Sequence, residues 1–414
     1  MDVLKPKYEV ADIFRLYGEQ YRKSHRMPVE QLNVMRNIEL CRTAVMGGHI
    51  ERCDCCGLEQ NAYNSCGDRH CPKCGAMAKE KWLADRKLDL IPAHYFHLVF
   101  TISHALNLLV RYNMKLMLTI LFASVNATLQ TFAADPQWRL NGKLGYIAVV
   151  HTWNQLLCDH YHLHCLVPGG ALSKDKLKWT PSGEKFLFKV ESLAKRFKNE
   201  FVFKVQQAYD QGQLKFPPDW TRVQIRTRFA ALVQKIRKED WIVYAKTPFA
   251  GPEKVLEYLG RYTHRVAISN RRIVSISNGK ISFTYKDRKN PDKNGKAEVK
   301  EKTHSADEFI SRFLLHVLPK GFMKIRYFGF LSPAHKKKNL KIIRNLINPN
   351  IKTLGKNRRI SETNDDQDNR HGHQSVSEMQ KGNDVKNPHD GQALYPQSQF
   401  QMFYRGQFMT VLGI

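Results

Sequence analysis

Negative charge is scarce in this sequence. Its 414 residues include 38 Asp and Glu against 66 Lys and Arg, so that the formal net charge is +28 at pH 7. A surplus of this size, spread along the chain, indicates a polyanionic partner such as a nucleic acid. A ribosome-like or simply soluble basic protein would have a similar composition, so charge alone does not separate an enzyme from a binding protein.

Long apolar runs are also missing. No stretch of about 18 consecutive apolar residues, the length that a membrane-spanning helix needs, occurs in the chain. Residues 1–7 (MDVLKPK) do not form an apolar signal region. We therefore expect a cytoplasmic protein without a membrane span, long enough for two or three domains.

Cysteine is absent from residues 1–40 and after residue 165, but six of the nine cysteines lie within residues 53–74. In a cytosolic chain such crowding indicates a metal site and not disulfides. Two Cys-x-x-Cys motifs have the spacing of a structural zinc ribbon. The expected zinc ligands are Cys53, Cys56, Cys71 and Cys74. Any of three further residues could replace one of these ligands: Cys55, Cys66 and His70. Cys66 and His70 could instead bind a second ion.

The order of the expected elements predicts an α+β fold. Apolar residues at helical spacing predict helices at 10–24, 29–45, 76–91 and 106–133. Aromatic and branched residues predict a strand at 94–102 and a central hairpin built from the apolar runs 146–150 and 162–167. We therefore expect an N-terminal helical and zinc-ribbon domain, followed by an antiparallel sheet with helices on one face.

Weaker patterns complete the chain. Helices are expected at 186–211, 226–238, 253–264 and 306–318, strands at 241–245, 266–269, 272–277 and 280–285, and a lysine-rich loop at 287–301. The composition changes after Pro333, where a basic segment begins. From residue 361 the chain is rich in Asn, Gln, Asp, Ser and His, which predicts disorder. The expected divisions are 1–92, 93–333, 334–360 and 361–414.

The pair His162 and His164 lies in the second strand of the expected hairpin. Side chains alternate across a strand, so both imidazoles share one face and Leu163 points into the core. The hairpin would bring His151 beside them, and three imidazoles could hold a divalent cation with one side open to substrate. A surface histidine pair is the plain alternative. Gln155 and His160 are rival third ligands. His97 could also face the metal, but a packed or surface position is favoured.

Tyr258 and Tyr262 lie four residues apart on the expected helix 253–264, so their phenols share one face. Such a pair is usually core packing, but Arg261 and Arg265 flank this one. A phenol has a pKa of about 10, and a nearby cation would favour the nucleophilic phenolate. Tyrosine suits strand transfer because a phosphotyrosine link can later be reversed by a free hydroxyl.

Five ordered motifs carry a resemblance to a known family. They are residues 64–74 (NSCGDRHCPKC), 95–101 (YFHLVFT), 151–155 (HTWNQ), 160–170 (HYHLHCLVPGG) and 258–270 (YLGRYTHRVAISN). With them the chain resembles the rolling-circle insertion-sequence transposases of the IS91 family, from about residue 10 to about residue 345. Residues 361–414 depart from this family, whose relatives end in a further cysteine-rich piece.

The resemblance implies a zinc-binding domain followed by an HUH endonuclease domain (His, hydrophobic residue, His). It implies nicking of single-stranded DNA at the element's ends, with a 5′-phosphotyrosine link and a free 3′-hydroxyl. His162 and His164 would be metal ligands, and Tyr262 and Tyr258 the nucleophile candidates, with Tyr262 the indispensable one. His151 as third ligand is our own inference, in line with the similar arrangement of plasmid relaxases.

The expected cofactors are a structural zinc ion and a catalytic Mg²⁺ or Mn²⁺, although three imidazoles suit zinc or manganese better than magnesium. Arg69, Arg261 and Arg265 are expected to contact DNA, and backbone contacts of this kind are salt-sensitive. Tyr95 and Trp153 could stack unpaired bases, but core packing is the favoured role. Two alternatives remain: a relaxase or replication initiator of the same chemistry, and a zinc-dependent DNA-binding protein without catalysis. No acidic triad of a two-metal transposase stands out.

Overall fold

The structure is a computed structural model. It describes residues 6–349, except for residues 185–186, 247–259, 261–262, 264 and 292–296. The expected tail at 361–414 and residues 350–360 of the basic segment lie outside the described residues, as does nearly all of the expected helix 253–264.

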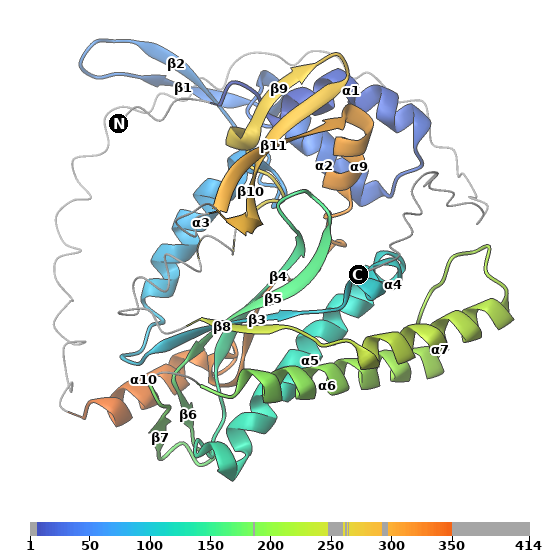
Figure 1. Cartoon of the computed structure of the whole chain (residues 1–414). Coiled ribbons are helices and arrows are strands. Elements are labelled where there is room, and N and C mark those ends of the chain that lie inside the picture. Colours follow the sequence, from blue (N-terminus) through green and yellow to red (C-terminus); the bar gives the residue numbers. More distant parts are fainter. Residues whose placement is uncertain are drawn as a thin grey trace, which may run out of the picture. The chain divides into compact units, whose positions relative to one another are not determined.

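Two helices begin the fold, α1 (Val10–Ser24) and α2 (Val29–Leu40). The first has the expected bounds, and Glu9 and Asp12 form a capping box at its start. Its apolar face packs on α9 (Ala306–Leu314), which lies beside it in Figure 1. The N-terminal helices thus share a core with the later part of the chain.

Helix α2 ends five residues before the expected position. Arg42 adopts the left-handed conformation, with φ of 58°, which stops the helix. The chain then forms a short 3₁₀ turn and a hairpin that the helical periodicity did not predict, β1 (Gly48–Arg52) with β2 (Glu59–Tyr63). Helix α3 (Pro72–Lys87) starts four residues before the predicted 76, because a proline fits the first helical position.

A five-stranded antiparallel sheet lies at the centre of the fold, in the order β12-β4-β5-β3-β8 (Figure 1). The predicted hairpin is confirmed as β4 (Tyr146–Trp153) and β5 (Asp159–Pro168). The expected strand 94–102 is β3 (Tyr95–Thr101), next to β5. The edges are β8 (Val243–Lys246) and β12 (Ile325–Phe328), and the sequence did not predict the latter.

Helices cover one face of this sheet, and the main apolar core lies between the two layers (Figure 1). The expected helix 106–133 is broken at Asn113 into α4 and α5, and the expected helices 186–211 and 226–238 are α6 and α7. Their bounds are α4 (Asn107–Tyr112), α5 (Met114–Ala134), α6 (Val190–Asp210) and α7 (Arg222–Lys238). Among the described helices, α5 alone is long and apolar enough to cross a membrane, but most of its apolar window is buried in this core.

The opposite face is covered at one end by α10 (Lys336–Ile347). Leu340 and Ile343 of this helix are buried with Phe330 and with Val149 of β4. The basic segment expected from residue 334 therefore begins as a packed amphipathic helix.

A second antiparallel sheet, in the order β11-β10-β9, lies next to α9. Two predictions here were wrong. Residues 266–269 do not form a strand. The expected lysine-rich loop 287–301 largely continues a hairpin, in which Lys300 pairs with Tyr285 and Glu301 with Thr284. The strands are β9 (Ile273–Ser277), β10 (Lys280–Pro291) and β11 (Ala297–Ser305), and a small separate pair is β6 (Gly170–Leu172) with β7 (Trp179–Pro181).

Candidate active site

Three histidines meet on the face of the central sheet that α5, α6 and α7 leave uncovered. His151 of β4 pairs directly with His162 of β5, and His164 follows two residues later on the same strand and the same face. The intervening Leu163 points into the helix-covered core, as predicted. The hairpin register thus brings together the three imidazoles that the sequence singled out.

The distances between these imidazoles suit a metal ion. One nitrogen of each of the three rings lies within 4.8 Å of the other two, and His162 Nε2 lies 3.1 Å from His164 Nε2. Two imidazole nitrogens that bind one ion at about 2.1 Å lie about 3.0–3.4 Å apart. His162 Nδ1 donates to the carbonyl oxygen of His160 at 2.9 Å, which leaves its Nε2 lone pair for the ion.

The surroundings keep His162 and His164 neutral. Burial, with a smaller contribution from His160, lowers the pKa of His162 to about 3. Burial and the neighbouring His162 lower the pKa of His164 well below its ordinary value. Arg265 acts in the same direction on both rings, so its side chain lies within electrostatic reach of the site. Neutral imidazoles are the protonation state that metal binding requires.

The sequence analysis considered that His97 could face the metal but favoured a packed or surface position. This residue of β3 lies on the same sheet face, is buried, and has its Nε2 2.9 Å from His164 Nδ1. It therefore occupies the outer position from which a partner orients a metal-bound imidazole. Side chains alternate along β3, and this alternation puts His97 on the sheet face that carries the three histidines. That pattern is the signal that could have identified it.

Other residues considered for this site have different places. The ring of Trp153 stacks on His151 at 4.9 Å and is buried, and Tyr95 is buried with its hydroxyl accepting the amide of Ile91. Both therefore pack in the core, as favoured. Gln155 accepts a hydrogen bond from Arg272 through its backbone oxygen, and neither Gln155 nor His160 belongs to the three-histidine group.

The expected nucleophiles Tyr258 and Tyr262, together with Arg261, lie outside the described residues. Gly260 in the same motif is described and is buried against α3. A Cβ at this position would lie 2.8 Å from the Leu83 side chain, which would have to shift to make room for it.

A four-cysteine cluster forms where α2 ends and α3 begins. It consists of Cys41, Cys66, Cys71 and Cys74, and the Cys74 sulfur lies 3.6 Å from both the Cys41 and the Cys66 sulfur. Tetrahedral zinc with Zn–S bonds of about 2.3 Å places its sulfurs about 3.8 Å apart, so the cluster fits this ion. Burial raises the pKa of the Cys71 thiol to about 12, and these thiols would lose their protons to a bound cation.

This cluster corrects the expected ligand set. Cys71 and Cys74 are members, but Cys53 and Cys56 are not: they lie at the turn of the β1–β2 hairpin, where the Cys53 sulfur is 3.5 Å from that of Cys55. The hairpin carries that turn away from the cluster. The early end of α2 brings in Cys41, a residue inside the longer helix 29–45 that the sequence predicted.

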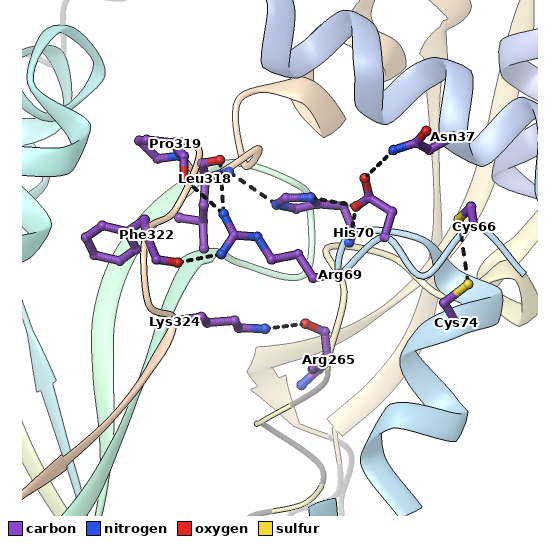
Figure 2. A network of polar contacts seen from close by, with 11 residues as sticks. Asn37, Cys66, Arg69, His70, Cys74, Arg265, Leu318, Pro319, Phe322 and Lys324 are labelled. Carbon is purple, nitrogen blue, oxygen red and sulfur yellow. Dashed lines mark hydrogen bonds and ion pairs between the residues drawn. The ribbon is translucent and has the colours of Figure 1, made fainter. Parts of the chain in front are cut away.

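The loop before α3 connects this cluster to the central sheet (Figure 2). The Arg69 guanidinium donates to the carbonyl oxygens of Leu318, Pro319 and Phe322. His70 accepts the Leu318 amide at 3.2 Å. Because these contacts engage Arg69 and His70, the structure gives both residues a connecting role. His70 is not a member of the four-cysteine cluster, and the DNA contact of Arg69 stays a prediction.

Comparisons with known proteins agree with this arrangement. Residues 13–102 match a family described as "Transposase zinc-binding domain", and residues 145–339 match one described as "Putative transposase". The chain is 46% identical over 344 residues to "Putative transposase y4qJ" of Sinorhizobium fredii (strain NBRC 101917 / NGR234), covering 83% of this chain and 85% of the relative. It is 28% identical over 295 residues to "Transposase for insertion sequence element IS801" of Pseudomonas savastanoi pv. phaseolicola, covering 70% and 68%. No solved structure matches the chain. The chain therefore belongs to the IS91 family of transposases, DNA-cleaving enzymes with an N-terminal zinc-binding domain.

Proposed function

We propose that this transposase is an HUH-type enzyme, which nicks single-stranded DNA at the ends of its element and transfers the strand through a 5′-phosphotyrosine. The observation that carries the proposal is the convergence of His151, His162 and His164 on one sheet face, with nitrogen distances that suit a divalent cation. The three imidazoles would hold Mg²⁺ or Mn²⁺, which polarises a scissile phosphate when bound.

In this proposal Tyr262 is the first candidate for the nucleophile and Tyr258 the second. The phenol oxygen forms a bond to the phosphorus, the phenol gives up its proton, and the 3′-oxygen leaves and becomes a hydroxyl. The reverse reaction with a new 3′-hydroxyl restores the tyrosine and joins the strands. Arg265, within electrostatic reach of the histidines, would stabilise negative charge that develops on the phosphate.

The four-cysteine cluster would hold a structural zinc, since its four sulfurs leave no position for substrate. The enzyme would act in the bacterial cytoplasm at the nucleoid, where its substrate DNA lies. A relaxase or replication initiator would use the same chemistry on a plasmid origin, and the DNA that flanks the gene separates these roles.

The test is an incubation of the full chain with labelled single-stranded DNA that carries the element's end, with Mg²⁺ or Mn²⁺, followed by a denaturing gel. We expect a protein–DNA adduct that Tyr258→Phe/Tyr262→Phe and His162→Ala/His164→Ala abolish. His104→Ala, outside the three-histidine group, should keep it. Intact DNA binding without an adduct in either ion would favour a binding protein and overturn the proposal.

A further inference from the structure

A pocket of about 220 Å³ lies between the first two turns of α3 and the end of the tyrosine motif, with Arg272 just after it. Lys79 lines it from α3, and Arg265 and Arg272 line it from the opposite side. Asp and Glu are absent from its described lining. At roughly 30 Å³ for each water molecule, the pocket has room for several waters or for one phosphate group with its ester oxygens.

Two of the cations that line this pocket, Arg272 and Lys79, have little charge compensation. Arg272 donates to the carbonyl oxygens of Thr284 and Gln155, which are neutral acceptors. Within the described part of the chain no carboxylate forms an ion pair with Arg272, and Lys79 pairs only with the exposed Glu80, at 3.2 Å. A cation that is withdrawn from water without an anion is costly, so an anion bound beside the largely buried Arg272 would stabilise it.

Lys324 lies next to Arg265. Its side-chain nitrogen donates to the backbone oxygen of Arg265 at 2.8 Å (Figure 2). The same nitrogen lies over the ring of Trp153. The described residues supply no ion-pair partner for Lys324 either. The hydrogen bond from Lys324 holds the backbone of Arg265, which lines the pocket and lies within electrostatic reach of His162 and His164.

The position of the pocket identifies the anion. Gly260, within the motif that holds both candidate nucleophiles, is part of its wall, as is Gly75 of α3. A DNA strand whose scissile phosphate is beside the histidines would place a neighbouring phosphate within reach of this pocket. Two arginines and a lysine are typical partners of a backbone phosphate, and the contact carries no base preference.

We propose that this pocket, formed by Lys79, Arg265 and Arg272, binds one backbone phosphate of the DNA strand and fixes the strand relative to the histidines. The zinc-binding domain then contributes directly to substrate positioning through α3. The inference rests on the proposed function only in taking DNA as the ligand.

The experiment measures binding of a fluorescent single-stranded oligonucleotide at several salt concentrations, without added Mg²⁺ or Mn²⁺. All proteins carry Tyr258→Phe/Tyr262→Phe, so that strand transfer does not contribute. For single strands, each lost phosphate contact reduces the slope of log K against log salt by about 0.7. We expect Lys79→Gln/Arg265→Gln to show this reduction.

The matched control is Lys81→Gln/Lys87→Gln, which removes two charges from exposed positions of the same helix outside the pocket. Its slope should stay closer to that of the parent protein. Equal slopes of log K against log salt for the two double variants would overturn the proposal that this pocket binds a phosphate. This holds whether or not the native enzyme forms an adduct. Thermal stabilisation of the parent by inorganic phosphate, with equal DNA slopes, would assign the pocket to a free anion and also overturn the proposal.

Discussion

His97 Nε2 lies 2.9 Å from His164 Nδ1, and the two rings are nearly parallel, with centroids 5.1 Å apart. If His164 donates its Nδ1 proton to His97, its Nε2 lone pair is left for a metal ion. We predict that His97→Ala weakens Mn²⁺ affinity about 10–100-fold, the usual effect of losing such an outer partner. His97→Gln, whose amide oxygen can accept the same hydrogen bond, should keep most of the affinity. Titration calorimetry measures both, and unchanged affinity in His97→Ala would exclude the positioning role.

Cys41 belongs to the observed cysteine cluster but not to the predicted ligand set. Its sulfur lies 3.6 Å from the Cys74 sulfur, while Cys56 lies outside the cluster. We predict that Cys41→Ser lowers the bound zinc by about one ion for each chain and lowers the melting temperature, because thiolate ligands hold structural zinc. Cys56→Ser should retain this ion. Elemental analysis with melting curves decides the matter, and the opposite pattern would restore the ligand set expected from the two Cys-x-x-Cys motifs.

Lys324 predicts a pH dependence of stability. Burial, together with the nearby Arg69 and Arg265, lowers the pKa of its ammonium from 10.5 to about 7. Between these values the unfolded chain binds the proton and the folded chain does not, so this group makes stability rise with pH above 7. Below pH 7 the folded chain also binds this proton, so the cost of burying the charged ammonium lowers the stability by its full amount. Lys324→Met should therefore gain most stability, relative to the native chain, at pH 6–7 and progressively less toward pH 9. Denaturant unfolding measures the difference, and a pH-independent difference would contradict the assignment.

Much of the central site could be predicted because it depends on local rules. The alternation of His162, Leu163 and His164 fixes which side chains share a face, and a hairpin with two apolar strands brings His151 alongside. Residue order was therefore sufficient to identify the three-histidine group.

The features that the sequence analysis did not predict depend on the local backbone conformation or on contacts between segments that are distant in the chain. Cys41 joins the cluster because the left-handed Arg42 ends its helix early, and a periodic pattern does not contain that turn. The role of His97 depends on the register between β3 and β5. Likewise, β12 follows an irregular segment, and its apolar residues become a strand only through pairing with β4.

The most direct test of the proposed chemistry is to isolate the protein–DNA adduct, digest it with protease and nuclease, and locate the modified residue by mass spectrometry. We predict a phosphate link on Tyr262, or on Tyr258 in a protein that carries Tyr262→Phe, with the DNA attached by its 5′ end. An adduct on a serine, on a histidine or through the 3′ end would contradict the account, as would cleavage of the DNA without any covalent link.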